Sequence, residues 1–255
     1  MPVRVASFNI HHGVGLDGRL DLARTADVIR ATGAGVVGLQ EVDRHMSARS
    51  EWADQAGWLA DGLSMAVVHG PTIDLDPDDP TVPDAPRRRY GNALLSTHPI
   101  RSWRAVPLPG GDGTEPRGLL TAVVDVDGAL VQVAATHLQV RSRSERMMQA
   151  ARVVAELGSG LGPGDHALPT VLTGDMNATP ESPEIAVLTD ALVDAWAAAG
   201  DGPGWTFDAA TPHARIDYVM TSPDLAARAA WLVPTDASDH YPVVADLPDL
   251  PSLSG

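Results

Sequence analysis

Short apolar runs recur along the chain, and many of them end abruptly in polar residues. The run from Thr170 to Thr173 ends in Gly174-Asp175-Met176-Asn177, a pattern typical of a buried strand that delivers polar side chains to one edge of a sheet. Residues 3–8 alternate in the manner of a half-buried strand and stop at Asn9. Runs of this kind predict strands at residues 3–8, 36–39, 91–96, 119–126, 130–136, 170–173, 215–220 and 241–247.

Helical spacing and capping residues predict helices between these strands. Asp21 is a suitable N-cap for a helix that ends at Gly33. Ser182 precedes a proline at the first position of another predicted helix. We also expect an amphipathic helix that begins at about Ser50 and a longer helix over residues 143–157.

Turn signals and the order of the elements indicate the fold class. Asp127-Gly128, between two strand runs, is typical of a tight β-hairpin. Residues 70–86 are rich in Pro and Asp, and we expect a surface loop there because strand signals resume at Gly91. Strands interspersed with helices and hairpins favour a mixed α/β layered fold over a purely parallel one. We expect a single domain over residues 1–248 and a short tail over 249–255.

Composition narrows the range of partners. The formal net charge of −15 repels polyanions and argues against an extended nucleic-acid surface, because such a surface needs a basic stripe. A bound divalent cation can invert the charge locally, so phosphate chemistry remains open. The chain contains no cysteine, which excludes thiolate catalysis and thiolate metal sites. Neither a signal peptide nor an apolar run of membrane-spanning length is visible, and we expect a cytoplasmic location.

Polar residues of the types used in catalysis stand at or near the ends of several predicted strands. In a layered α/β fold, strand ends at one edge converge on one cleft. Each residue alone has a plainer explanation, since Asn9 can cap a turn, Glu41 can be a solvated carboxylate and His137 can be a hydrogen-bonded core histidine. A carboxylate within a buried run, such as Asp217, needs a partner. The set consists of Asn9, Glu41, His137, Asp175, Asn177, Asp217, Asp239 and His240.

These residue types suit metal-assisted chemistry on a phosphoester. Glu41 and Asn9 offer only oxygen ligands, which are the donors that Mg²⁺ and Mn²⁺ prefer. Asp217 can fix the tautomer of His240 and raise its basicity. Asp175 is suited to orienting or deprotonating a water molecule. The side chains suited to stabilising phosphoryl oxygens are those of Asn177 and His137. Together these roles describe metal-assisted, in-line hydrolysis of a phosphoester.

The chain resembles the endonuclease/exonuclease/phosphatase superfamily, which includes pancreatic-type deoxyribonuclease, abasic-site exonucleases, neutral sphingomyelinases and inositol polyphosphate 5-phosphatases. The resemblance covers residues 3–246 and rests on motifs in the family's order. These motifs are Ser7-Phe8-Asn9-Ile10, Leu39-Gln40-Glu41-Val42, Tyr90-Gly91-Asn92-Ala93-Leu94-Leu95-Ser96, Thr136-His137-Leu138, Gly174-Asp175-Met176-Asn177, Arg215-Ile216-Asp217-Tyr218 and Ser238-Asp239-His240. The resemblance implies a four-layer α/β sandwich, in which two mixed β-sheets pack face to face with helices outside and the cleft lies at one end.

The resemblance also implies residue roles. The metal site, for Mg²⁺ or Mn²⁺, would be formed by Glu41 and Asn9, with Asp239 as a further ligand or a neighbouring group. The implied catalytic residues are His240, Asp217, Asp175, Asn177 and His137. Glu115 stands near the place where the deoxyribonuclease branch keeps a carboxylate that pairs with the second histidine, and Arg117 in the same stretch can instead be the functional residue, contacting phosphate.

The sequence also indicates a class of substrate. Arg87-Arg88-Arg89 is interpreted as a solvated face, whereas the arginines at 141, 143 and 146 follow His137 and are expected to contact substrate phosphate at the cleft rim. The expected substrate-binding residues are Arg117, Arg141, Tyr90 and Asn92. We predict hydrolysis of a phosphodiester or phosphomonoester of a small molecule or lipid headgroup. The alternatives are a Mg²⁺-dependent nuclease acting on DNA or RNA and, less favoured, a non-catalytic binding module.

Overall fold

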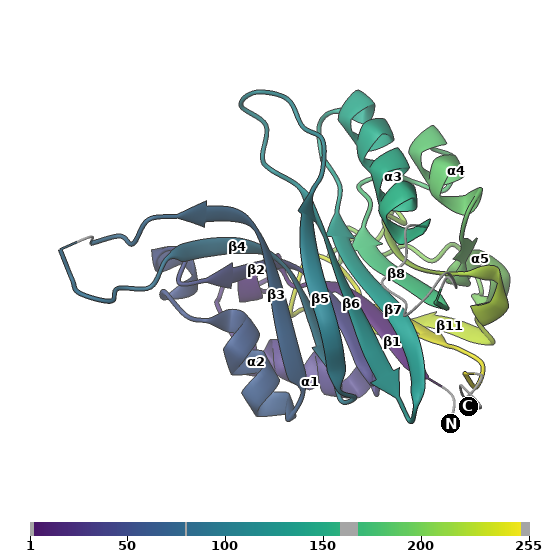
Figure 1. Ribbon diagram of the computed structural model, residues 1–255, viewed down its shortest axis with the longest axis horizontal. Helices are drawn as coiled ribbons and strands as arrows, with labels where there is room; N and C mark the ends of the chain where they lie inside the picture. The colour runs from purple at the N-terminus through teal and green to yellow at the C-terminus, as the bar shows by residue number, and fades with distance from the viewer. Residues whose placement is uncertain (1–2, 80, 159–167, 251–255) are drawn as a thin grey trace.

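Two six-stranded β-sheets form the centre of the molecule (Figure 1). The computed structural model describes residues 3–79, 81–158 and 168–250. The strand order of the first sheet is β11 (Ala229–Leu232), β12 (Val243–Asp246), β1 (Arg4–Asn9), β2 (Val36–Arg44), β4 (Arg88–Ser96) and β3 (Ala66–Leu75). The order of the second sheet is β5 (Ile100–Pro107), β6 (Gly118–Val126), β7 (Ala129–His137), β8 (Thr170–Asp175), β10 (Asp217–Thr221) and β9 (Val193–Asp194).

Helices cover the outer faces of both sheets. The first sheet carries α1 (Leu22–Thr32) and α2 (Gln55–Leu63), and the second carries α3 (Arg143–Gly158) and α4 (Pro183–Thr189). The remaining short helices are α5 (Ala195–Ala199) and the 3₁₀ turns η1 (His11–Gly13), η2 (Ala48–Ser50) and η3 (Pro223–Leu225). Both sheets contain parallel and antiparallel pairs. The expected four-layer α/β sandwich with two mixed sheets is therefore confirmed.

Apolar clusters hold the layers together. Val5, Leu120 and Val171 belong to the cluster between the two sheets, whereas Phe8 and Ile29 belong to the cluster between the first sheet and its helices. Strand β1 thus contributes to both clusters and is buried on both faces. The prediction of a half-buried strand over residues 3–8 was wrong, because β1 lies inside the sheet, between β2 and β12, and is covered on both sides.

The predicted boundaries of α1 are confirmed, and capping residues mark both of its ends. The side chain of Asp21 accepts a hydrogen bond from the Arg24 backbone N–H at 2.9 Å, and Gly33 ends α1 in the left-handed conformation with φ 64°. The start of the next helix at about Ser50 was wrong. Helix α2 begins at Gln55, because Asp54 caps it by accepting from the Gly57 N–H at 3.0 Å.

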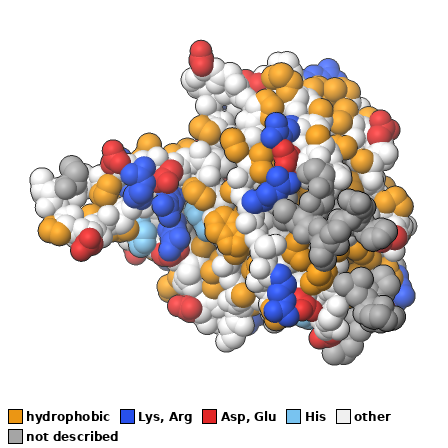
Figure 2. Space-filling model, in the orientation of Figure 1, with side chains coloured by type: hydrophobic (Ala, Val, Ile, Leu, Met, Phe, Trp, Pro, Cys, Tyr) orange, Lys and Arg blue, Asp and Glu red, His pale blue; other side chains and the backbone are white. Residues whose placement is uncertain are grey.

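The Pro- and Asp-rich segment is a long hairpin, so the predicted surface loop over 70–86 was wrong at its start. Strand β3 continues to Leu75, which pairs with Arg88 of β4, and the strand accommodates Pro71 at a register irregularity. The hairpin projects from the body of the molecule (Figure 1), with acidic and basic side chains side by side (Figure 2). Arg87 donates to Asp74 at 2.6 Å and to Asp76 at 2.7 Å, which fits the predicted solvated face.

The turn at Asp127-Gly128 and the character of the helices test two further predictions from the sequence. Asp127 and Gly128 have φ of 52° and 90° between the paired residues Val126 and Ala129, which confirms the predicted tight hairpin. None of the helices in the described parts of the chain has the length and apolar character needed to cross a membrane. The division into a domain over 1–248 and a tail stays a prediction, and residues 251–255 of that tail lie outside the described ranges.

Candidate active site

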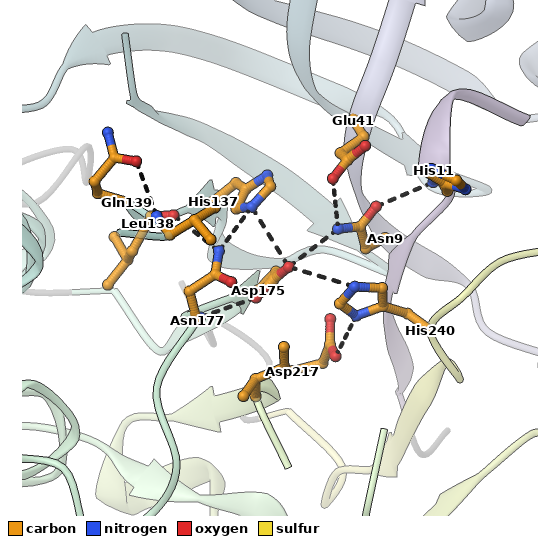
Figure 3. Close-up of polar contacts among 12 residues, drawn as sticks. Asn9, His11, Glu41, His137, Leu138, Gln139, Asp175, Asn177, Asp217 and His240 are labelled. Atoms are coloured by element: carbon orange, nitrogen blue, oxygen red, sulfur yellow. Dashed lines mark hydrogen bonds and ion pairs between the residues drawn. The ribbon is translucent and has the colours of Figure 1, made fainter. Parts of the chain in front are cut away.

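The strand ends that carry polar residues meet at one end of the sandwich. Strands β1 and β2 run parallel, with Asn9 opposite Gln40, and β7 and β8 run parallel, with His137 opposite Asp175. Strand β10 runs antiparallel to β8 and begins at this same edge, where Asp217 pairs with Asp175. Because the two sheets pack face to face, side chains from both sheets converge here (Figure 3).

The backbone is locally unusual where two of these side chains enter the site. Glu41 has φ 59° and lies in a register irregularity of β2 between Leu39 and Val42. Asn177 has φ 48° directly after β8. Left-handed φ values are costly for residues other than glycine and are concentrated at functional sites, and bulges redirect side chains. Glu41 is thereby displaced from the regular alternation of β2, and the chain turns at Asn177, two residues after the end of β8.

Asn9 connects Glu41, a candidate metal ligand, to Asp175 at the centre of the site. Its side-chain nitrogen donates to Glu41 Oε1 at 3.2 Å and to Asp175 Oδ2 at 3.0 Å, while its side-chain oxygen accepts from the His11 backbone N–H at 3.0 Å. Asn9 is 1 % exposed, so water does not compete for these bonds. Two carboxylates from different sheets are thus held around one amide group.

His240 and Asp217 form the predicted pair. The Nδ1 atom of His240 lies 2.8 Å from Asp217 Oδ2, and both side chains are buried. The Nε2 atom consequently faces Asp175, 3.8 Å from its Oδ2 atom, and the ring packs against Phe207 with centroids 4.9 Å apart. Burial alone lowers the pKa of His240, but the charge and hydrogen bond of Asp217 outweigh burial and raise this pKa to about 10.

Asp175 lies at the centre of the arrangement. Its Oδ1 atom accepts from the Asn177 backbone N–H at 2.9 Å, and its Oδ2 atom lies 3.4 Å from His137 Nε2. Burial and the neighbouring negative charge of Asp217 raise the pKa of Asp175 above its ordinary value. A carboxyl group with a raised pKa beside an imidazolium is suited to exchanging a proton near neutral pH.

His137 and Asn177 form the opposite wall from His240. The side-chain nitrogen of Asn177 donates to His137 Nε2 at 2.9 Å and to the Leu138 carbonyl at 3.1 Å. Burial, followed by the positive charge of Arg117, lowers the pKa of His137 to about 3. The two histidines of the site therefore differ in charge at neutral pH, with His137 neutral and His240 cationic.

Two groups of residues have the chemistry to hold a metal ion. Donor atoms of Asp175, Asp217 and His240 lie within 4.8 Å of one another, but the 2.8 Å bond between Asp217 and His240 already uses that pair. The Glu41 carboxylate and the Asn9 amide oxygen are oxygen donors of the kind that Mg²⁺ or Mn²⁺ prefers. In this structure the Asn9 nitrogen faces Glu41 and its oxygen accepts from the His11 N–H, so the amide would have to turn to join Glu41 as a ligand. Burial raises the pKa of Glu41, but contacts with His12, His137 and Asn9 outweigh burial and lower it, so this carboxylate is charged.

Asp239 lies on the side of His240 away from the pair with Asp217. Its Oδ1 atom is 4.0 Å from His240 Nε2, 3.8 Å from His11 Nδ1, and accepts from Ser238 Oγ at 3.3 Å. Ser238 Oγ lies 2.7 Å from the Asn9 carbonyl and 3.2 Å from the His240 N–H. The turn that carries Asp239 is therefore fastened to the end of β1, and Asp239 lies at the edge of the site.

Most of the expected substrate-binding residues border one small cavity beside the site. Tyr90, Asn92 and Arg117 line it together with Glu41 and His137. The Asn92 side chain is held in place because its nitrogen donates to the Gly118 carbonyl at 3.0 Å. Glu115 pairs with Arg117 at 3.0 Å. Among the described residues no ion pair joins Glu115 to His137, the histidine with which it was expected to pair.

The arginines after His137 divide into two kinds. Arg146 is tied into the protein, donating to Glu184 at 2.6 Å and to the Gln139 carbonyl at 3.0 Å. Arg143 is largely exposed and lies 3.7 Å from Glu184. Arg141 is exposed and forms no hydrogen bond or ion pair with any residue in the described ranges. Of these three side chains, Arg141 is the one that a substrate can engage without breaking an existing contact.

Sequence reasoning missed the two histidines that follow Asn9. His12 Nδ1 lies 3.8 Å from Glu41 Oε2, and the His12 carbonyl accepts from Gln55 Nε2 at 2.6 Å. His11 and His12 both have left-handed φ, at 45° and 43°. Their position directly after a polar strand end was the available signal, although nothing in the sequence indicates which carboxylate each would approach.

The chain is similar to a known protein family and to several solved structures. A model of the Endonuclease/Exonuclease/phosphatase family matches residues 6–240. An endonuclease/exonuclease/phosphatase structure from Beutenbergia cavernae is similar, with TM-score 0.81, 30 % identity and alignment over 100 % of this chain and 73 % of that chain. A mannosyl-6-phosphatase from Bacteroides thetaiotaomicron has TM-score 0.76, 19 % identity and coverage of 97 % and 100 %. The human Nocturnin catalytic domain, solved with bound sulfate, has TM-score 0.69, 19 % identity and coverage of 97 % and 94 %. No curated protein matches the chain.

Proposed function

The chain belongs to the endonuclease/exonuclease/phosphatase family, whose members hydrolyse phosphoester bonds, and from this premise we propose that it is a divalent-metal-dependent phosphoesterase. The supporting observation is the arrangement around Asp175, whose carboxyl group is approached by Asn9, His137, the Asn177 N–H and His240. Glu41 lies on the other side of Asn9. The site thus combines an oxygen-only metal set with an acid–base pair.

Each residue of the site has a separate role in the proposed in-line hydrolysis. Asp175 orients the attacking water and accepts its proton, because its carboxyl group has a raised pKa and is fixed by several contacts. His240, held as a cation by Asp217, stabilises the negative charge that develops on the phosphoryl oxygens. Glu41 and Asn9 would hold Mg²⁺ or Mn²⁺, which when bound supplies Lewis-acid stabilisation of phosphoryl charge. Asn177 and His137 border the phosphate position on the opposite side.

The proposed substrate is a phosphodiester or phosphomonoester of a small molecule or lipid headgroup. The net charge of −15 disfavours long polyanions, and the arginines at 87–89 face the aspartates of their own hairpin. A nuclease is the alternative. A non-catalytic binding module is disfavoured because Glu41, Asp175 and His240 are all present in one site. The cytoplasmic location stays a prediction.

The first test is the loss of activity in His240→Ala. Hydrolysis of bis(p-nitrophenyl) phosphate with Mg²⁺ should fall by a factor on the order of 10² or more, because the phosphoryl charge loses its cationic partner. The matched control is His98→Ala, since His98 follows the opposite end of β4 from the site and should leave the rate unchanged. Unchanged hydrolysis in His240→Ala would contradict the assignment of the site.

The metal requirement is tested on the unmodified protein. We expect EDTA to abolish hydrolysis and Mg²⁺ or Mn²⁺ to restore it. A panel of p-nitrophenyl phosphate, bis(p-nitrophenyl) phosphate, sphingomyelin, inositol phosphates, RNA and plasmid DNA then separates the substrate classes. Activity that survives EDTA would exclude the metal-dependent mechanism.

A further inference from the structure

A groove next to the active site lies between the edge strands of the two sheets. It runs between β3 and β5 and has a volume of about 290 Å³. Its walls are mainly apolar, formed by Pro71, Val106, Pro107, Leu108, Pro116 and Leu119. This volume is at the lower limit of ordinary ligand pockets, so the groove suits one small chemical group.

The groove and the active site share two of their lining residues. Thr72 and Arg117 line the groove and also border the small cavity that contains Glu41 and His137. One end of a molecule in the groove would therefore lie beside Arg117, next to the small cavity that Glu41 and His137 border. The groove is positioned as a subsite for a substituent of the phosphate.

Two polar groups of the groove lining are already bonded within the protein. The Thr72 hydroxyl donates to the Tyr90 carbonyl at 3.3 Å. The Gly118 carbonyl accepts from the Asn92 side chain at 3.0 Å and from the Thr136 hydroxyl at 3.1 Å. These two groups offer little to a sugar or another hydroxyl-rich group, which would lose hydrogen bonds to water against the apolar walls. The lining therefore favours an apolar occupant.

Arg117 is the exception to this pattern. The residue is 6 % exposed, and one guanidinium nitrogen pairs with Glu115 at 3.0 Å. Its Nε atom is buried and has no hydrogen-bond partner. An unsatisfied buried donor on a cation favours an anionic oxygen at the junction of the groove and the active site.

The lining also disfavours a nucleobase in the groove. Among the described residues that line it, none is aromatic, and Arg117 is the only cation. Sites for single-stranded nucleic acid combine aromatic stacking surfaces with a positively charged path for the backbone. The groove has neither of these features.

We propose that the groove between β3 and β5 binds an uncharged aryl or alkyl group esterified to the phosphate, while Arg117 donates to a non-bridging phosphate oxygen. This inference rests on the proposed function and specifies its substrate class as phosphoesters with a compact apolar substituent. Arg117 thereby links recognition of the substituent to placement of the phosphate.

The test compares the binding of phosphonates that carry different substituents, with Mg²⁺ present, by isothermal titration calorimetry. Phenylphosphonate and hexylphosphonate should bind at least about tenfold more tightly than methylphosphonate, a difference of about 1.4 kcal/mol. Ala105→Phe, which places bulk on the groove wall, should reduce this ratio to near one. Ser102→Phe adds the same bulk to β5 outside the lining and should preserve the ratio.

Arg117 is tested by its own pair of variants. Arg117→Met should weaken phenylphosphonate and methylphosphonate by a similar factor, whereas Arg117→Lys should retain part of the affinity for both. Thermal unfolding of each variant distinguishes a loss of binding from a loss of fold. If Arg117→Met left both affinities unchanged, the assigned phosphate contact would be wrong.

Other outcomes separate this inference from the proposed function. Equal binding of the phosphonates, or no binding, by a protein that hydrolyses bis(p-nitrophenyl) phosphate would overturn the groove assignment and leave the phosphoesterase activity standing. Tighter binding of glucose 6-phosphate or thymidine 5′-phosphate than of phenylphosphonate would also overturn it. Absence of hydrolysis for every phosphoester in the panel would instead contradict the proposed function.

Discussion

Asp175 is the residue on which the polar contacts of the site converge, and its surroundings show how far residue types predict chemistry. The pairing of Asp217 with His240 was predicted, because a carboxylate in a buried strand needs a partner. In the structure Asp217 Oδ2 and His240 Nδ1 lie 2.8 Å apart. The approach of His12 to Glu41 could not be predicted, because it depends on left-handed backbone after Asn9 and not on residue type. The bond between Glu115 and Arg117 likewise depends on the path of the loop that carries them.

The positive charge of His240 leads to a prediction about its pKa in an Asp217 variant. Asp217→Asn removes the negative charge that holds the pKa of His240 at about 10, so this pKa should fall toward the ordinary histidine value. The measurement is an NMR titration of the protein in EDTA. The raised pKa stabilises the fold below the ordinary value of about 6.5, and this contribution is lost as the pH rises through about 10. An unshifted titration of His240 in the variant would exclude Asp217 as the cause.

Glu41 gives a second prediction, for metal binding. Glu41→Gln removes the negative charge of the oxygen-only set, and the affinity for Mn²⁺ or Mg²⁺ should fall by at least about tenfold, since divalent ions prefer carboxylate ligands. Calorimetric titration with Mn²⁺ measures this change without relying on catalysis. Glu51→Gln is the matched control, because Glu51 is exposed outside the site and its replacement should leave the affinity unchanged. Equal affinities for the wild type and Glu41→Gln would remove Glu41 from the metal site.

At the scale of elements, the sequence was most informative where an apolar run was buried and sharply ended. The ends of β1, β7 and β8 fall at the polar residues that interrupt their apolar runs. The edge strand β5 was not predicted, because Arg101, Ser102 and Arg104 interrupt its apolar positions and no apolar run forms. The extension of β3 beyond Pro71 was also missed, since its pairing with β4 overrides the turn signals of the segment.

Helix capping gives a prediction about stability. Asp21→Ala removes the acceptor for the Arg24 N–H at the start of α1, and the free energy of unfolding should fall by about 1 kcal/mol. Asp61→Ala, at an exposed position of α2, is the control and should change stability by less than about 0.5 kcal/mol. Urea unfolding measures both variants. An unchanged stability in Asp21→Ala would show that the cap contributes little to this fold.

At the scale of the whole molecule, the arrangement of the two sheets positions the site, and the net charge limits the class of substrate. The seven family motifs were not needed to predict convergence, because a layered α/β fold brings strand ends from distant parts of the sequence to one edge. The sequence could not indicate the groove between β3 and β5, because it exists only where edge strands of different sheets face each other.

The net charge of −15 predicts weak engagement of long nucleic acids. Nicking of plasmid DNA at physiological salt should be much slower than hydrolysis of a small activated diester at the same enzyme and Mg²⁺ concentrations. The ratio of the two rates is measured with one enzyme preparation. Efficient nicking would overturn the small-substrate assignment and favour the nuclease alternative, while leaving the catalytic site in place.

Asp175 is the proposed catalytic centre of the metal-dependent phosphoesterase. The most direct measurement is kcat/KM of Asp175→Asn for bis(p-nitrophenyl) phosphate with saturating Mg²⁺. The substitution keeps the shape of the side chain and removes its charge and basicity. We expect kcat/KM to fall by a factor on the order of 10² or more with the fold retained, as judged by circular dichroism. A value of kcat/KM within about twofold of the wild type, well under the 1.4 kcal/mol of a tenfold change, would exclude Asp175 as the catalytic base.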